Sequence, residues 1–287
     1  MVYKGILGAA VGDIIGSRFE WHNYKGKDFE LFTPHNHFTD DTVMTLALGK
    51  ALADCNGDYT NLETIATKTM QTLGTQYADA GYGGSFSAWL NSDSPKPYNS
   101  WGNGAAMRVS ACAYFAKSET EAKQLSYQVT ALTHNHPEGL KGAEATTMAT
   151  YLALHGKNNE DIKNYIKTNY YPLDFTLDDI RADYKFHVSC QKSVPQAFVA
   201  FFEANNYEET IRNAISIGGD SDTIAAIAGS IACAYYGIPE NIKTQGLSYL
   251  DNNLRHIAQT IDSQIEKNKK ANEPLLLSSN YQGHSSK

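Results

Sequence analysis

The sequence lacks several features that would point to a membrane, an oxidising compartment or a nucleic-acid partner. No apolar run among its 287 residues is long enough to cross a bilayer, and no charged-then-apolar leader is present. Its four cysteines are scattered, and no two have the spacing of zinc ligands or of a redox pair. The net charge of −7 gives no general attraction to nucleic acid or to an anionic membrane. We therefore expect a cytoplasmic protein that binds no membrane and for which nucleic acid is a disfavoured but open partner, and we expect a monomer.

Strand-like alternation of apolar and polar residues is also nearly absent, with residues 184–188 as the one short candidate. Apolar residues recur instead at helical spacing along most of the chain. This pattern predicts a single all-α domain over residues 1–267, followed by a polar C-terminal tail over residues 268–287. The predicted helices cover residues 2–16, 41–54, 62–77, 105–116, 119–132, 137–155, 161–168, 194–205, 207–217, 223–236 and 239–267.

Two acidic clusters, roughly 180 residues apart, each precede a helix of small apolar residues. The first reads FTDDT over residues 38–42, and the second reads GGDSDT over residues 218–223. Four carboxylates with flanking threonine hydroxyls form an oxygen-only ligand set, which suits hard cations such as Mg²⁺ or Mn²⁺. The matching architecture of the two segments indicates that they meet in space and hold metal together.

Helix capping is the alternative interpretation of these clusters, because aspartate before a helix satisfies free backbone N–H groups. Two adjacent aspartates in one cluster and an Asp-x-Asp in the other exceed what capping requires. Four neighbouring carboxylates without a cation would also raise one another's pKa values and cost stability. If the clusters converge, metal binding is therefore the better interpretation.

Small residues recur on one face of the first helix and on the helix that follows the second acidic cluster. Such smooth faces let two backbones approach closely, and we expect them to bring the acidic clusters together. Tight packing without any function is the alternative. The positions are Gly8, Gly12 and Gly16 in the first helix and Ala225, Ala228, Gly229 and Ala232 in the second.

Four further segments suggest what a metal would act on. Residues 100–108 form a glycine turn that opens a helix, where free N–H groups can bind a phosphate or pyrophosphate. Residues 81–86 form a second turn, whose aromatic side chains could stack on a base or ribose. Residues 133–137 place two histidines before a helix, where they are suited to contact substrate hydroxyls or phosphate. Glu20 is a candidate general acid or base. Ordinary turns, and for Glu20 a solvated surface group, are the competing interpretations.

In this order the motifs resemble those of the ADP-ribosylglycohydrolase family, which includes the glycohydrolase that reactivates dinitrogenase reductase and the crystallin J1 proteins. The resemblance extends from Gly5 to about Tyr236 and rests on the motifs GAAVGDIIGSRFE, FTDDT, GNGAAMR, THNHP and GGDSDT. It implies an all-α orthogonal multi-helix bundle with two Mg²⁺ or Mn²⁺ ions in a central cleft.

The resemblance also implies roles for single residues. Glu20 matches the family's glutamate near the anomeric carbon and is our candidate proton donor or gate, while the acidic ligands Asp41 and Asp222 would help the metals to activate a water. The implied metal ligands are Thr39, Asp40, Asp41, Asp220, Asp222 and Thr223. The implied substrate contacts are Gly83, Gly84 and Ser85 at the base or ribose, Asn103, Gly104, Ala105 and Ala106 at the diphosphate, and His134 or His136 at the distal ribose.

The predicted reaction is hydrolysis of the bond between ADP-ribose and an acceptor, with release of ADP-ribose. A protein-linked acceptor is favoured, with arginine ahead of serine because the compact chain is more similar to that branch; nucleic acid or a free small molecule stays open. Residues 91–100 and 170–190 lie outside the shared motifs and are candidates for acceptor recognition. Two other functional classes compete with this one. The first is a Mg²⁺-dependent phosphohydrolase, whose Glu-x-x-Glu helices are missing here. The second is a non-catalytic crystallin-like binder, in which we would expect some of the metal ligands to be lost.

Overall fold

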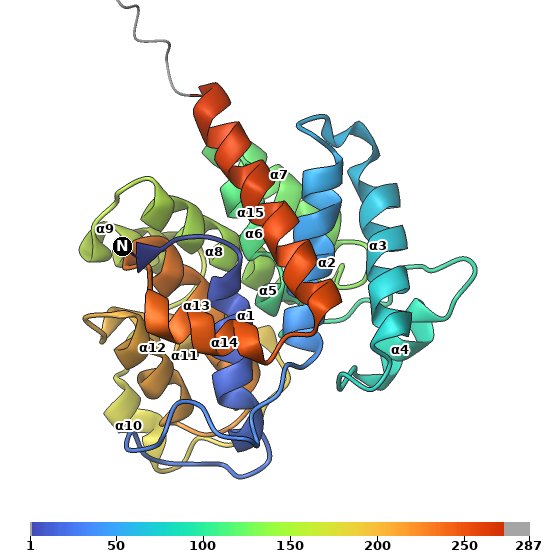
Figure 1. The fold of residues 1–287 in the computed structure, drawn as a ribbon. Coiled ribbons are helices and arrows are strands. Elements are labelled where there is room, and N and C mark those ends of the chain that lie inside the picture. Colours follow the sequence, from blue (N-terminus) through green and yellow to red (C-terminus); the bar gives the residue numbers. More distant parts are fainter. Residues whose placement is uncertain (1, 273–287) are drawn as a thin grey trace, which may run out of the picture.

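Helices make up nearly all the regular structure of the computed structural model, which describes residues 2–272 (Figure 1). The helices before residue 155 are α1 (Leu7–Gly16), α2 (Asp40–Asp54), α3 (Leu62–Gln76), α4 (Gly84–Leu90), α5 (Gly104–Met107), α6 (Ser110–Phe115), α7 (Glu119–Thr130) and α8 (Pro137–Leu154). The later helices are α9 (Asn159–Asn169), α10 (Leu177–Arg181), α11 (Cys190–Phe202), α12 (Tyr207–Ile215), α13 (Ser221–Tyr235), α14 (Glu240–Ser248) and α15 (Asn252–Asn272). Short 3₁₀ helices lie at Ser17–Phe19 (η1) and Tyr59–Asn61 (η2).

The predicted all-α class is confirmed, but the predicted location of the one strand candidate is wrong. Residues 184–188 are irregular, and strand structure within residues 2–272 is limited to β1 (Val2–Tyr3) and β2 (Ile238–Pro239), which pair antiparallel. The first helix therefore begins at Leu7 rather than at residue 2. The stretch is short, and the segment beside it pairs with its end only through an isolated bridge between Gly102 and Ser189, with the Asn103 N–H donating to the Val188 carbonyl oxygen at 2.8 Å.

Several predicted helices have different boundaries in the structure. The predicted helix 105–116 is divided into α5 and α6, and the predicted helix 239–267 is divided into α14 and α15. Helices α4 and α10 are too short to show a helical period and were not predicted. The last helix continues through Asn272, past the predicted start of the tail at residue 268, and residues 273–287 of that tail lie outside the described part.

Helices α1 and α13 lie side by side at the centre of the bundle (Figure 1), as the small-residue faces predicted. A Cβ added at Gly12 would stand 2.2 Å from the Ala225 carbonyl oxygen, and one at Gly16 would stand 2.6 Å from the Asp222 Cα. Because these neighbours are backbone atoms, a larger side chain would force the two helices apart. The contact thus fixes the distance from the end of α1 to the start of α13.

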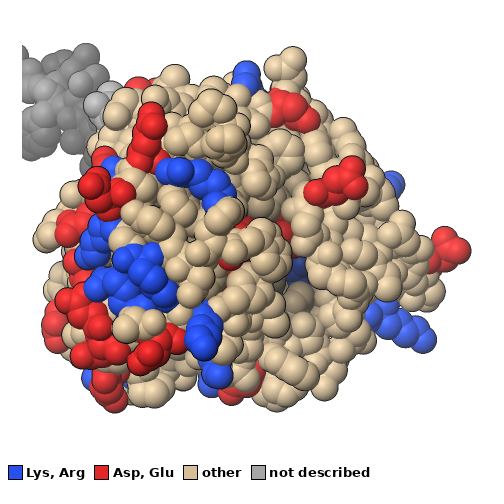
Figure 2. Space-filling view, turned by 90° about the horizontal axis from the view of Figure 1, so that it is seen from below, with Lys and Arg blue, Asp and Glu red and all other residues tan. Residues whose placement is uncertain are grey.

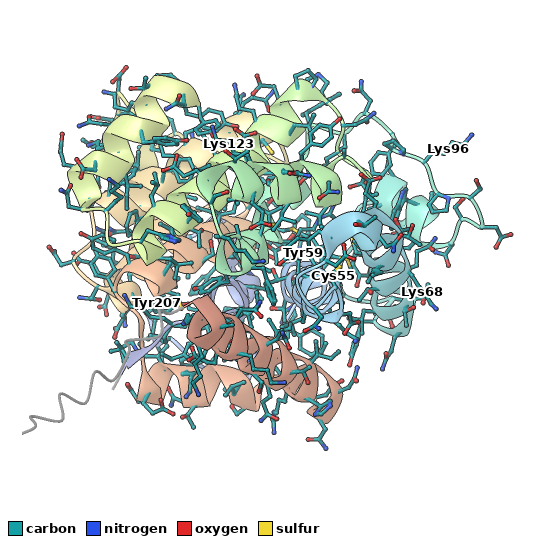
Figure 3. All side chains as sticks on the ribbon, turned by 90° about the horizontal axis from the view of Figure 1, so that it is seen from above. Cys55, Tyr59, Lys68, Lys96, Lys123 and Tyr207 are labelled. Atoms are coloured by element: carbon teal, nitrogen blue, oxygen red, sulfur yellow. The ribbon has the colours of Figure 1, made fainter. Side chains whose placement is uncertain are left out.

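Other helices surround this pair and complete a large core, and Ala113, Ala122, Met148 and Tyr151 form a small second cluster. The Tyr207 side chain, labelled in Figure 3, is buried, and its hydroxyl donates to the Gly8 carbonyl oxygen at 2.9 Å, which ties α12 to α1. The four cysteines are free and buried. No helix within residues 2–272 is both long and apolar enough to cross a membrane. The cytoplasmic location and the monomeric state remain predictions.

Candidate active site

The first acidic cluster is held at the start of α2 by an aspartate on α1. The Asp13 carboxylate is buried and accepts hydrogen bonds from the Thr39 N–H at 2.9 Å, the Thr39 hydroxyl at 2.7 Å and the Thr42 N–H at 3.1 Å. These donors belong to the N-terminal turn of α2, whose free N–H groups require an acceptor. Asp13 therefore caps α2 from a neighbouring helix and orients the residues between the two threonines.

The second acidic cluster follows a turn that two glycines make possible. Gly218 and Gly219 have φ values of +65° and +74°, in the left-handed region that other residues rarely adopt. The Gly219 N–H donates to the Asn23 side-chain oxygen at 3.1 Å, which ties the turn to the segment after Glu20. The turn sends the chain directly into α13, with Asp220 as its N-terminal cap residue.

The two clusters meet, as the sequence predicted. The Thr223 hydroxyl on α13 donates to the Asp41 carboxylate on α2 at 3.0 Å. Carboxylate oxygens of Asp13, Asp41 and Asp222 all lie within 4.8 Å of one another, and so do those of Glu20, Asp220 and Asp222. The two groups share Asp222, which places it between two adjacent positions where acidic oxygens converge.

Burial and mutual repulsion favour the protonated forms of these acids. Burial, followed by repulsion from Asp13, Asp40 and Asp220, raises the pKa of Asp41 well above its usual range. Burial, followed by repulsion from Asp220 and Asp41, does the same to the pKa of Asp222. Burial and nearby acids raise the pKa of Asp40 to about 7 and that of Glu20 to about 7.

This arrangement fits a cation better than it fits a network of side chains alone. The Asp41 Oδ1 atom is buried and has no hydrogen-bond partner. Neither group of carboxylates forms a direct ion pair with Lys or Arg in the described chain, and the Arg108 charge attracts Asp41 only at longer range. Buried carboxylates without a compensating charge are costly, and oxygen-only sets bind hard divalent cations. The donor set is therefore suited to Mg²⁺ or Mn²⁺.

The clusters form one wall of a pocket of about 600 Å³, within the size range of ligand sites. Figure 2 shows a hollow near the centre of the face seen from below, with acidic side chains at its edge. The opposite wall is formed by residues of α4 and α5 and by segments near residues 98–103 and 186–188. A second hollow of about 820 Å³ lies elsewhere, and its lining includes no carboxylate among the described residues.

A buried arginine sets the protonation state of a histidine in the non-acidic part of the pocket. The Arg108 guanidinium donates to the Thr133 hydroxyl at 2.6 Å, and the Thr133 oxygen lies 2.7 Å from the His134 Nδ1. Because the arginine can only donate, the threonine proton points to Nδ1, and Nε2 carries the histidine proton. Burial and the nearby Arg108 charge lower the pKa of His134 well below its usual range, so the ring is neutral. It can offer one N–H to a ligand.

Residues 2–273 match the family model described as ADP-ribosylglycohydrolase. The chain belongs to the ADP-ribosylglycohydrolase family. The resemblance seen in the motifs is thereby confirmed over nearly the whole chain, and it places the protein among hydrolases that act on glycosyl bonds.

Individual members of the ADP-ribosylglycohydrolase family agree with this assignment. The chain is 25% identical to human ADP-ribosylhydrolase ARH3, over 92% of this chain and 94% of that protein. It is also 25% identical to the ADP-ribosyl-[dinitrogen reductase] glycohydrolase of Rhodospirillum rubrum, over 90% of this chain and 92% of that one. A solved structure titled ADP-ribosylglycohydrolase-related protein complex has the same fold, with a TM-score of 0.68, 23% identity, and coverage of 91% of this chain and 96% of that chain.

Most of the residues that the family resemblance assigned to metal or catalysis lie at this acidic wall. Thr39 is the exception, because it is buried behind the wall and its hydroxyl donates to Asp13. The pocket is lined by Glu20, Asp40, Asp41, Asp220, Asp222 and Thr223.

The residues assigned to the diphosphate are placed differently from expectation. The Asn103 amide donates to the Asp220 carboxylate at 2.6 Å, so it supports the second acidic cluster. The Ala105 and Ala106 N–H groups donate to the carbonyl oxygens of Gly102 and Asn103, and both alanines are buried outside the pocket lining. Only the Asn103 and Gly104 positions of this set face the pocket.

The histidine pair divides in the same way. His134 lines the pocket, whereas the His136 Nδ1 accepts from the Glu138 N–H at 3.1 Å and caps α8. His136 also packs against Trp101, with ring centroids 5.5 Å apart. Gly83, Gly84 and Ser85 all line the pocket at the start of α4.

Several residues of the site were not identified from the sequence. Asp13 gave a usable signal, because it is the single charged residue in the apolar, small-residue helix α1. Arg108 ends the GNGAAMR motif, but the sequence pattern indicates no role for it. Trp21 and Phe186 line the pocket and carry no local pattern, although Phe186 falls in the 170–190 stretch proposed for acceptor recognition.

Proposed function

We propose that this protein hydrolyses the glycosidic bond between ADP-ribose and a protein side chain, with two Mg²⁺ or Mn²⁺ ions, and releases free ADP-ribose. The main support is the pair of carboxylate groups that share Asp222 at the wall of a pocket of about 600 Å³. The names of the human and Rhodospirillum rubrum relatives describe enzymes that act on ADP-ribosyl groups, which agrees with this proposal.

The acidic wall supplies enough oxygen ligands for two cations. Asp41 and Asp222, with Asp13 beside them, would hold one ion, and Asp220 and Asp222 would hold the other with Glu20 nearby. The proposed ligand set is completed by Asp40, Thr223 and Thr39. The Thr39 hydroxyl donates its proton to Asp13, and its oxygen would keep a lone pair for an ion. When bound, the ions would offset the carboxylate charge and polarise sugar hydroxyls and a water at the reaction centre.

The protein's own residues remove a proton from the water and return one to the leaving atom. The water oxygen forms a bond to the anomeric carbon as the bond from that carbon to the acceptor atom breaks. We assign removal of the water proton to Asp41 or Asp222, the acidic ligands at which the two carboxylate groups adjoin. Because the transition state resembles an oxocarbenium ion, accurate positioning matters more than a strong nucleophile.

Glu20 is our candidate for returning a proton to the leaving nitrogen or oxygen. Its carboxyl is only half-buried, and burial with the neighbouring Asp220 and Asp40 charges raises its pKa to about 7. Bound cations would offset the Asp220 and Asp40 charges, so burial is the cause that would still raise the Glu20 pKa in the metal-loaded protein, as suits a general acid. The Glu20 carboxyl can hold either a proton or a cation. The Glu20→Gln substitution separates these two roles when turnover and the response to Mg²⁺ are measured together.

The opposite wall would hold the rest of the ADP-ribosyl group. The neutral His134 ring can donate its Nε2 proton to a sugar or phosphate oxygen. Gly83 and Gly84 have no atom within 4 Å of an added Cβ, so the pocket is open beside them. Ser85 and Gly104 line the same space.

A release assay tests the proposal directly. Purified protein with Mg²⁺ should release intact ADP-ribose from a mono-ADP-ribosylated protein, and EDTA should stop the release. Arginine-linked and serine-linked substrates are compared in parallel to identify the acceptor. Formation of AMP and ribose phosphate would instead establish a phosphohydrolase, and ADP-ribose binding without release from either substrate would establish a non-catalytic binder.

A further inference from the structure

Exposed aromatic and branched side chains are concentrated at the mouth of the acidic pocket. Six large hydrophobic residues are exposed within the described chain, and four of them line this one pocket. The four are Trp21, Trp101, Phe186 and Val188, with exposed fractions of 75%, 51%, 37% and 57%. Exposed apolar surface gathered at one place marks a binding surface more often than scattered single residues do.

Two of these residues form a stacked platform. The Trp21 and Phe186 rings have centroids 5.1 Å apart and planes inclined by 21°. Phe186 covers one face of the indole, and the 75% exposure of Trp21 leaves the other face open to solvent. A flat, open aromatic face backed by a second ring can hold a planar group at little conformational cost.

The platform stands at the reacting end of the pocket and is firmly attached there. Trp21 directly follows Glu20, whose carboxylate belongs to the second acidic group. The Lys25 ammonium donates to the Tyr184 and Ile217 carbonyl oxygens, which joins the segment after Trp21 to the segment before Phe186. A group stacked on Trp21 would therefore lie beside the bond that is hydrolysed, on the acceptor's side of it.

The described lining of the pocket offers no exposed Lys or Arg that would repel a cationic group at the platform. Glu20, Asp40, Asp220 and Asp222 line this pocket, and Arg108 is the single Lys or Arg in its described lining. Arg108 is 1% exposed and interacts with Thr133 and His134, away from solvent. A guanidinium is planar, cationic and weakly hydrated, and it stacks well on an indole face.

We propose that Trp21, backed by Phe186, is the acceptor platform of this enzyme and stacks the guanidinium of an arginine-linked substrate. This inference rests on the proposed glycohydrolase function and adds the residues that determine acceptor specificity. Trp21 contacts the leaving group, while the contacts to the ADP-ribosyl group lie elsewhere in the pocket.

The test compares Trp21→Ala with wild-type protein on arginine-linked and serine-linked substrates. The kcat/KM for the arginine-linked substrate should fall roughly 3- to 30-fold, because that range corresponds to the loss of one cation–π contact. The serine-linked kcat/KM should fall by much less, because any loss through the hydrogen bond between Trp21 and Glu20 is common to both substrates, and the thermal stabilisation by ADP-ribose should change little. Trp21→Phe should retain most of the arginine activity. Tyr127→Ala removes a similarly exposed aromatic on α7, outside the pocket, and should have no effect.

Each of the remaining outcomes overturns the assignment. Equal losses on both substrates would make Trp21 a general peptide contact, and a lost response to ADP-ribose would place Trp21 on the nucleotide side. An unchanged kcat/KM for the arginine-linked substrate would show that the platform has no part in acceptor recognition.

Calorimetric titration of agmatine in the presence of ADP-ribose and Mg²⁺ separates this inference from the proposed function. If wild-type protein hydrolyses neither substrate, the proposed reaction fails. Agmatine binding that Trp21→Ala loses, with cadaverine as the non-guanidinium control, would still support the platform. Equal agmatine binding by both proteins, or none by either, would contradict it.

Discussion

The two walls of the pocket are built in different ways. The acidic wall stands on α1, α2 and α13, which lie in the centre of the bundle and are almost entirely buried. The opposite wall consists of the short helices α4 and α5 and of irregular segments near residues 98–103 and 186–188. Apart from Glu20, which follows η1, the residues proposed for chemistry are thus fixed by core packing, whereas those proposed for recognition sit on connections.

This difference follows from what each wall must do. Carboxylates that share cations must keep their spacing to within a fraction of an ångström, and helix termini buried in a core provide such rigidity. Recognition surfaces can vary in length and composition when they lie on loops, because loop changes disturb few packed residues. The comparison predicts that substitutions on the acidic wall affect turnover and folding, while those on the other wall affect the choice of substrate.

The largest effect is expected where the two carboxylate groups overlap. Asp222→Asn should lower turnover by more than about 100-fold, because it alters the residue shared by both proposed cation positions. It should also reduce the rise in melting temperature that Mg²⁺ produces. Glu20→Gln should lower turnover by about 100-fold, the usual scale of a general acid, while most of the Mg²⁺ response is kept. Melting curves and turnover measured side by side check both variants.

Two results would contradict these assignments. An Asp222→Asn protein that stays active and is still stabilised by Mg²⁺ would remove Asp222 from the metal site. A Glu20→Gln protein that loses the Mg²⁺ response together with turnover would make Glu20 a metal ligand rather than a proton donor.

A smaller effect, on stability, is expected from the contact between α1 and α13. Gly12→Ala would place a Cβ 2.2 Å from the Ala225 carbonyl oxygen, and relief requires the helices to separate. Overpacking of this kind costs about 1–3 kcal/mol, which exceeds the roughly 1 kcal/mol gained from the helix propensity of alanine. We expect a lower melting temperature and weaker Mg²⁺ stabilisation, measured by thermal unfolding with and without the metal.

Gly83→Ala is the matched control on the other wall. An added Cβ there meets no atom within 4 Å, and the Gly83 φ of −63° is one that alanine adopts readily. Its melting temperature should stay unchanged or rise slightly, since alanine reduces the freedom of the unfolded chain. Equal destabilisation by the two substitutions would refute the idea that the acidic wall depends on close helix packing.

The same contrast explains how much could be predicted from the sequence. The acidic clusters and the glycine face of α1 have short-range patterns, so their convergence could be predicted. Asp13 could not be placed, because its partners Thr39 and Thr42 lie 26 and 29 residues away. Trp21 and Phe186 likewise meet only through the tertiary fold. The Ala105 and Ala106 N–H groups were predicted to be free for phosphate but close the turn themselves.

The smallest effect is a difference in pH dependence between the metal-free and metal-loaded protein. Folding raises the pKa of Asp40 from 3.8 to about 7 and that of Glu20 from 4.5 to about 7, chiefly through burial and repulsion. At pH values between the unfolded and the folded pKa values, the folded metal-free protein binds more protons than the unfolded chain. Its free energy of unfolding therefore falls as pH rises. The stability these groups contribute is complete below about pH 4 and is lost as pH rises through about 7.

Bound cations should suppress this dependence, because they replace the protons as the charges that offset the acidic wall. Melting temperatures measured from pH 5.5 to 8.5 should therefore fall more steeply in EDTA than in Mg²⁺. Because other titrating groups contribute equally to both series, the difference between the two slopes isolates the acidic wall. Parallel slopes would show that metal and protons do not compete there. The Gly83→Ala variant, which changes only the opposite wall, should leave the difference in slope intact.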